Sequence, residues 1–558
     1  MIFLKLNVYS LEKRIADDRF ARVTEKNIWI MKNFTAICRL FVVGMTLLAC
    51  DPGGGFEAPP EDNGGEMGHG MIVLGEKLEN PYAVRNITRA LDKLYPTRAD
   101  REDLMPTDRY VRFLPKDGQQ YERLLSLGLL LSDHPLDYRI VRDGDYYQDP
   151  AIPEGELTWQ YAVVPPDLPL PEGIRVEILD DCFIPETGTR SNGIDWDAVE
   201  REAYALTGNA RLYREPTRAG KTCPKGRICI VDDDLNGGKP FGVAGVTVLC
   251  NSFVKFSTAT TDRDGYYEMS KGYDSQLRYR LLFRNVRGFS IGFNLLLLPA
   301  STSALGKAGP EGLDCTVTTA SENKLFARAA VNNAVYDYYS RCSSEDLDIP
   351  TPPDKLRIWL FHNLNVSSCP MLRHGAMVED GVISEYLGKY VPLLELFLPD
   401  VTIGVKGNES YSGLYAAACH EMAHASHYTR VGNSYWNKYI GYVLKSFAKS
   451  RKLDYGDGTS EDAGYCAIGE MWAYFLQDRM WNDRYGGNAA FSGLNWWFRP
   501  QIFSYLNDRR FTASMIFQGL QSDIHGTEAL RSRLKTLYPS ESSLIDQAFA
   551  RYDYGNED

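Results

Sequence analysis

Residues 415–428 read YAAACHEMAHASHY, a segment with two histidines four residues apart among small alanines. We expect this segment to lie in the middle of a long helix, where the alanines allow close packing. On a helix, residues four apart lie about 40° apart around the axis and one turn along it. His420 and His424 can therefore both reach one metal ion, and Glu421 beside them can accept a proton from a water molecule at that ion.

The residues from His420 to His424 match the pattern H-E-x-x-H. With 8 histidines among 558 residues, chance would give this pattern on the order of 0.01 times. Imidazole nitrogens are common zinc ligands, and a catalytic zinc site keeps one position open for water. The sequence therefore predicts a Zn²⁺ site that includes His420 and His424.

His427 lies on the same predicted helix face, one further turn along the axis. A straight helix cannot place three of its own side chains around one tetrahedral ion. The metzincin pattern H-E-x-x-H-x-x-G-x-x-H solves this with a glycine that breaks the helix, but here His427 occupies the glycine position and Arg430 the last histidine position. We therefore expect His427 to lie beside the metal site or in a groove, without binding the metal.

Glu470 is the strongest candidate for the third ligand. It is the one carboxylate in the apolar segment AIGEMWAYFL (467–476), which we expect to be helical. A lone acid in such a helix is costly unless it is paired or binds a metal. Gly469 beside it would permit close helix approach. Weaker candidates are Asp478, Asp462, Glu461, His362 and His374.

The pairing of H-E-M-A-H (420–424) with G-E-M-W-A-Y (469–474) resembles the gluzincin clan of zinc metallopeptidases. The resemblance covers residues 320–558. It implies zinc held by His420, His424 and Glu470, with Glu421 as general base and a peptide or protein as substrate. His525, Tyr474 and Tyr428 are candidates for stabilising an oxyanion.

The remainder of residues 320–558 is predicted to be rich in helices. A helix is expected at 322–342, strands at 355–361 and 400–405, and mostly helices toward the end of the chain. Strands do not alternate regularly with helices, so we expect a helix-rich, zincin-like α+β domain.

Residues 226–300 contain short β-rich runs between turns. The segments VAGVTV (243–248) and TTDRDGYY (260–267) resemble the carboxypeptidase-regulatory-like β-sandwich, which implies an accessory domain without catalysis of its own. Asp262 and Asp264 could begin a calcium loop, but Tyr273 stands where such a loop needs its final glutamate. We therefore expect a hairpin turn there.

Residues 71–225 are predicted to form an N-terminal α+β region. A strand at 110–115, a helix at 121–131 and a strand at 136–141 give a β–α–β pattern and hence an N-terminal α/β layer. We see no catalytic cluster in this region, and we expect His134 to be structural. The expected fold class is therefore multidomain α+β.

The segment FTAICRLFVVGMTLLAC (34–50) resembles a bacterial lipoprotein signal peptide with its lipidated cysteine at Cys50. The resemblance implies that residues 1–49 comprise upstream residues and a removed signal peptide. Residues 50–70, rich in Gly, Pro and acids, would form a flexible tether. The implied location is the cell envelope, as an outer-membrane lipoprotein held by a lipid anchor. The alternative is an uncleaved anchor, but the apolar run falls short of the ~20 residues that a spanning helix needs.

The net charge and the number of cysteines indicate which partners to exclude and whether free thiols are expected. Lys plus Arg number 61 against 73 for Asp plus Glu, a net charge of -12, which disfavours nucleic acid. Beyond Cys50 there are nine cysteines, so at least one thiol should be free in an exported chain. Cys223 and Cys229 are close enough in sequence to pair, and Cys419 and Cys466 could either bridge or remain buried thiols.

A second class of function is a non-catalytic surface lipoprotein that binds a glycan or a protein. The lipid tether, the β-sandwich and the 34 tyrosines and 9 tryptophans favour it. Glu421 disfavours it, because a structural zinc site has no need of a base.

Cys50→Ser should abolish lipid attachment, because the thiol that accepts the lipid is gone. We expect the variant either in the soluble fraction or as unprocessed precursor, as judged by fractionation and N-terminal sequencing. A variant that stays membrane-bound and unchanged in processing would show that Cys50 is not the anchor.

Overall fold

The computed structural model describes most of the chain from residue 70 onward. The described residues are 70–96, 104–153, 156–185, 193–214, 221–235, 237–292, 301–321, 324–362, 364–376, 399–450, 455–487 and 496–552. The predicted signal peptide, Cys50 and nearly all of the predicted tether lie outside them. Within these ranges, no helix has both the length and the apolar character needed to cross a membrane.

The described part of residues 70–214 contains two antiparallel sheets and three α-helices. One sheet pairs β1 with β3, and the other has the strand order β4-β2-β5. The elements are β1 (Val73–Lys77), α2 (Val84–Leu94), β2 (Asp108–Leu114), α3 (Gly118–Ser126), β3 (Tyr138–Arg142), β4 (Gln160–Val164), β5 (Arg175–Cys182), α4 (Trp196–Leu206) and the 3-10 helix η1 (Ala210–Leu212).

The predicted strand, helix and strand of this region correspond to β2, α3 and β3, but the β–α–β arrangement is wrong. β2 is hydrogen-bonded on both edges, to β4 and β5, so it leaves no edge for β3. β3 pairs instead with β1, antiparallel. The helix also ends earlier than predicted, because Gly128 takes a φ of 74° just beyond its C-cap.

Residues 225–317 form two further sheets that share one core. One has the order β10-β6-β14 with β7 beside β6, and the other the order β13-β11-β8-β9. Both sheets take strands from beyond residue 300. The strands are β6 (Lys225–Ile230), β7 (Phe241–Gly242), β8 (Thr247–Ser252), β9 (Lys255–Thr260), β10 (Tyr266–Glu268), β11 (Leu277–Leu282), β13 (Thr302–Ala308) and β14 (Cys315–Val317).

The Asp262 segment is a turn, as predicted, although it does not close a hairpin. The Asp262 carboxylate accepts hydrogen bonds from the backbone N–H groups of Asp264 and Tyr266, both at 2.9 Å. The strands on either side, β9 and β10, pair with different strands in different sheets. The turn therefore carries the chain from one sheet to the other.

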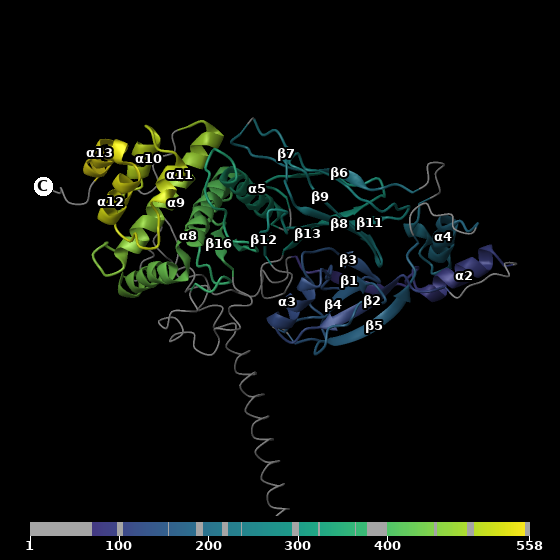
Figure 1. Ribbon diagram of the computed structural model, residues 1–558. Helices are drawn as coiled ribbons and strands as arrows, with labels where there is room; N and C mark the ends of the chain where they lie inside the picture. The colour runs from purple at the N-terminus through teal and green to yellow at the C-terminus, as the bar shows by residue number, and fades with distance from the viewer. Residues whose placement is uncertain are drawn as a thin grey trace, which may run out of the picture.

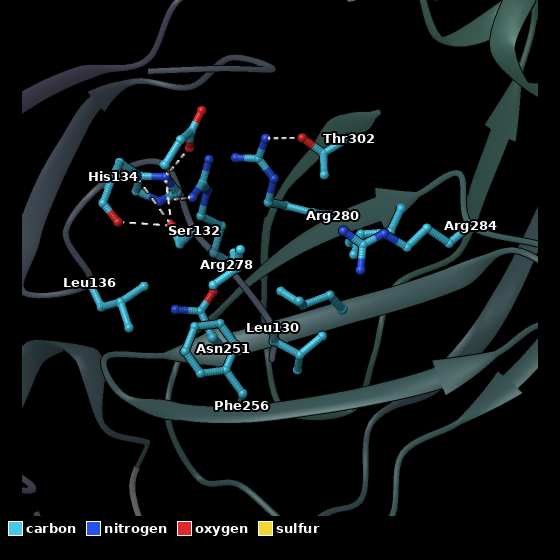
Figure 2. Close-up of a pocket in the computed structure, with 14 residues that line it drawn as sticks. Leu130, Ser132, His134, Leu136, Asn251, Phe256, Arg278, Arg280, Arg284 and Thr302 are labelled. Carbon is cyan, nitrogen blue, oxygen red and sulfur yellow. Dashed lines mark hydrogen bonds and ion pairs between the residues drawn. The ribbon is translucent and has the colours of Figure 1, made fainter. Parts of the chain in front are cut away.

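The N-terminal region packs on the outer face of β11, where Arg278 and Arg280 alternate with core residues (Figure 2). Arg278 binds the Asp143 carboxylate through Nε at 3.1 Å and Nη2 at 2.5 Å, and its Nη1 donates to His134 Nε2 at 2.6 Å. Arg280 Nη2 donates to Thr302 Oγ1 at 2.7 Å. His134 thus lies in a contact between two parts of the fold.

The C-terminal part combines a small parallel sheet, of order β12-β15-β16, with helices. The strands and helix predicted at 355–361, 400–405 and 322–342 are confirmed as β15, β16 and α5. The elements are β12 (Ser290–Ile291), α5 (Leu325–Cys342), β15 (Arg357–Phe361), β16 (Val401–Gly404), α8 (Tyr411–Ser450), α9 (Ala463–Tyr485), α10 (Gln501–Asn507), α11 (Ala513–Gln518), α12 (Thr527–Leu537), η3 (Pro539–Glu541) and α13 (Ser542–Tyr552).

Figure 1 shows how these parts are arranged. The helices α8 to α13 gather at one end, the two sheets of residues 225–317 lie in the middle with the N-terminal strands alongside, and α2 and α4 lie at the opposite end. The fold is thus mixed α+β, as predicted.

The predicted long helix is two helical segments joined at Gly432. This residue has φ 75° and ψ -178° inside α8, torsions that are essentially limited to glycine. The break lets the second segment turn back, so that the Trp436 ring packs edge-on against the rings of His424 and His427. Gly432 therefore determines which side chains cover the histidine segment.

All nine cysteines of the described residues are free. Cys223 and Cys229 are not bridged, and neither are Cys419 and Cys466. Cys419 and Cys466 are fully buried, so they pack as small apolar side chains.

Gly432→Ala should lower the free energy of unfolding by ~1–3 kcal/mol, because the Cβ makes the required torsions costly. Gly441→Ala is the matched control: it lies in the second segment of α8 with no heavy atom within 4 Å of an added Cβ. The control should be neutral or stabilising by up to about 1 kcal/mol. Urea denaturation followed by tryptophan fluorescence measures both, and equal stability of the two variants would contradict this account of the break.

Candidate metal centre

The first segment of α8 carries His420 and His424 on the side that faces α9. Their Nε2 atoms lie 3.2 Å apart, which is the proximity that the i, i+4 spacing predicts. His420 is 3% and His424 is 1% exposed. Two imidazoles are thus held together in the interior.

Glu470 of α9 completes the cluster. Its Oε2 lies 3.5 Å from His420 Nε2, and its Oε1 lies 3.5 Å from His424 Nε2. The carboxylate is 0% exposed, and one ligand atom from each of the three residues lies within 4.8 Å of the others. Within the described residues, this is the one group of three or more such side chains close enough to hold a metal ion.

Gly469 is not needed for the close packing of α9 against α8. A Cβ added at Gly469 would lie 3.9 Å from the His424 ring, an ordinary van der Waals contact. The prediction that this glycine permits close helix packing is therefore wrong as a steric requirement.

The charges of the cluster are mutually stabilising. Burial raises the pKa of Glu470, but the His424 and His420 imidazoles outweigh it and hold that pKa well below the usual range. Burial lowers the pKa of His420, although its contact with Glu470 opposes the change. The cluster therefore favours an ionised Glu470, which is the protonation state that a carboxylate ligand needs.

Glu421 lies next to the cluster and is 1% exposed. Its Oε2 has no hydrogen-bond partner among the described residues. Burial, and then the negative charge of Glu470, raise its pKa well above the usual range. A buried carboxylate with an open acceptor and a raised pKa is suited to taking up a proton.

His427 does not belong to the ligand cluster. It is 0% exposed, and its ring packs against those of Tyr435 and Trp436 at 5.3 and 5.9 Å. Neither ring nitrogen has a hydrogen-bond partner among the described residues. Burial, with the nearby His424 and Arg430, lowers the pKa of His427 to about 3. It is therefore a neutral packing residue beside the cluster.

The weaker ligand candidates lie elsewhere. His374 contacts the Asp400 carboxylate through Nδ1 at 2.8 Å, and Asp462 pairs with Lys438 at 3.8 Å. None of the five weaker candidates is a member of the cluster: Asp478, Asp462, Glu461, His362 and His374.

Of the three oxyanion candidates, Tyr474 packs against a residue of the cluster. Its ring packs edge-on against His420 at 4.6 Å, and its hydroxyl forms a hydrogen bond with that of Tyr455 at 3.0 Å. The Tyr428 hydroxyl donates to the carbonyl of His374 at 2.9 Å. His525 stacks on Tyr465 at 4.8 Å.

Tyr439 is a residue of the site that the sequence analysis missed. Its hydroxyl donates to Glu470 Oε1 at 2.5 Å, and its ring stacks on His424 at 5.7 Å with 29° between the planes. The available signal was Gly432 followed by the aromatic residues Tyr435, Trp436 and Tyr439 at helical spacing. That pattern indicates an aromatic helix face beyond a break.

Comparison with known proteins adds no identification: no protein family model matches the chain, and neither the curated proteins nor the solved structures contain a match.

Proposed function

We propose that the protein is a zinc-dependent peptidase, with His420, His424 and Glu470 as metal ligands and Glu421 as general base. The observation that carries the proposal is the spacing of the ligand atoms. Zinc–nitrogen and zinc–oxygen bonds of about 2.0–2.2 Å in a tetrahedron require ligand atoms ~3.3–3.5 Å apart. Here the two Nε2 atoms lie 3.2 Å apart, and each lies 3.5 Å from a different oxygen of Glu470. One ligand atom from each of the three residues lies within 4.8 Å of the others, so the donors are close enough to converge on one ion.

The chemistry of the donors also fits zinc. Two imidazoles and one carboxylate form a three-ligand set that leaves the fourth position open for catalysis. When bound there, zinc would supply the Lewis acidity that polarises a water molecule and the scissile carbonyl. The nine described cysteines contribute no member to the cluster, which disfavours a thiolate-based structural site.

Glu421 gives the site a means of moving protons. Its open Oε2 can accept the proton of the attacking water, and the same carboxyl can pass it to the departing amine. Burial and the negative charge of Glu470 raise the pKa of Glu421, which favours its uptake of the proton. A site that only bound zinc for stability would gain nothing from a buried carboxylate with an open acceptor.

We also propose that the enzyme is anchored in the cell envelope through a lipid on Cys50. The support is the sequence 34–50, with its apolar run ending in Leu-Leu-Ala-Cys. A short acidic and glycine-rich tether would then hold the catalytic part near the membrane surface.

Glu421→Gln should keep zinc and lower peptidase activity by roughly 10²–10⁴-fold, the usual contribution of a general acid–base group. The assay is cleavage of a denatured protein, with zinc content measured on the same sample. Glu409→Gln, an exposed acid before α8, is the control and should match the wild type. Full activity in Glu421→Gln would remove Glu421 from the mechanism.

Glu470→Ala should lower zinc affinity by several orders of magnitude, because one of three protein ligands is lost. Asp478→Asn is the matched control, a buried acid on the same helix but outside the cluster, and it should retain zinc. His427→Ala should cost less than Glu470→Ala, because His427 packs beside the cluster and is not one of its members. Titration with a chelator ranks the variants, and retention of zinc by Glu470→Ala with loss from His427→Ala would overturn the ligand assignment.

A further inference from the structure

Tyr439 touches two of the three cluster residues at once. Its hydroxyl donates to Glu470 Oε1 at 2.5 Å, and its ring lies nearly parallel to the His424 imidazole. Tyr439 is buried, with 5% of its surface exposed. A side chain in this position can restrain both the orientation of the carboxylate and that of the imidazole.

The hydrogen bond distinguishes the two oxygens of Glu470. A phenol O–H donates and a carboxylate oxygen accepts, so Tyr439 occupies one acceptor direction of Oε1. Oε2 lies on the side of His420 Nε2, at 3.5 Å. The hydrogen bond from Tyr439 therefore restrains a carboxylate whose two oxygens each face one imidazole, Oε1 that of His424 and Oε2 that of His420.

The position of Tyr439 follows from the break at Gly432. The second segment of α8 returns along the first, and Tyr435, Trp436 and Tyr439 lie on its inner side, where each ring packs on His424 or His427. Of these three residues, Tyr435 donates its hydroxyl to the carbonyl of Ile524 at 3.2 Å, and Trp436 donates its indole N–H to the carbonyl of Cys369 at 2.9 Å. Tyr439, by contrast, donates its hydroxyl to Glu470, a proposed ligand.

We propose that Tyr439 is a positioning residue of the metal centre, which sets the ligating geometry of Glu470 and the ring plane of His424. This inference rests on the proposed zinc function. Residues that hydrogen-bond to metal ligands fix the orientation of those ligands, and their loss typically costs 10–100-fold in metal affinity or activity. Tyr439 would act through Glu470 and His424, without contacting the substrate.

Tyr435→Phe is a closely matched control for Tyr439→Phe. Tyr435 lies one turn earlier on the same helical segment, is equally buried, packs on a histidine and also donates one buried hydrogen bond. Both substitutions remove one hydroxyl and retain the ring. They differ in that the hydroxyl of Tyr439 binds a proposed zinc ligand and that of Tyr435 binds a backbone carbonyl.

The experiment measures zinc affinity by competition with a chelator for the full chain and both variants. Tyr439→Phe should weaken zinc binding 10–100-fold, and Tyr435→Phe should leave it unchanged. Cobalt(II) substitution gives a second readout, because the visible absorption of the bound ion reports its ligand geometry. The cobalt spectrum should change in Tyr439→Phe and remain that of the wild type in Tyr435→Phe.

The possible failures are distinguishable. If the wild-type chain binds neither zinc nor cobalt, the proposed function itself is wrong. If the wild type binds and the two variants have equal affinities and unchanged spectra, the zinc proposal stands and the role of Tyr439 is overturned. If Tyr439→Phe does not fold, Tyr439→Leu, which also lacks a donor, provides the comparison, and wild-type affinity and spectrum in that variant would overturn the role.

Discussion

The burial of the Glu470 carboxylate is the constraint on which the C-terminal part of the structure depends. A charge that is 0% exposed must be compensated, and here His420 and His424 lie within 3.5 Å of its oxygens. That compensation fixes how α9 packs against the first segment of α8. The buried Glu421 follows His420 directly on the same helix, so the contact that allows the two helices to pack is also the centre of the proposed chemistry.

Local patterns were sufficient to predict the members of this centre. The i, i+4 spacing places the two histidines together on any helix, and Glu470 was identified because an acid in an otherwise apolar helix needs a partner. The exclusion of His427 from the cluster followed from helix geometry in the same way. The class of the fold, α+β, and the types of several elements such as α5, β15 and β16 were likewise evident from periodicity.

The features that could not be predicted depend on contacts between segments that are far apart in the sequence. The strands β2 and β3 have the right types, but their pairing is decided by β4 and β5, which occupy both edges of β2. The helix that carries the histidines was predicted as one long helix, because a single glycine within a helical pattern does not by itself indicate a break. The torsions of Gly432 break it, and Tyr439 reaches Glu470 only because of that break.

The most direct measurement of the central claim is the zinc X-ray absorption spectrum of the purified full-length protein. The account predicts about one zinc ion per chain, bound by nitrogen at ~2.0–2.1 Å and oxygen at ~2.0–2.2 Å. Multiple-scattering features should indicate two imidazoles. In Glu470→Ala the bound zinc, and with it these features, should be lost. Protein without zinc, or zinc with sulfur ligands at ~2.3 Å, would contradict a centre built from His420, His424 and Glu470.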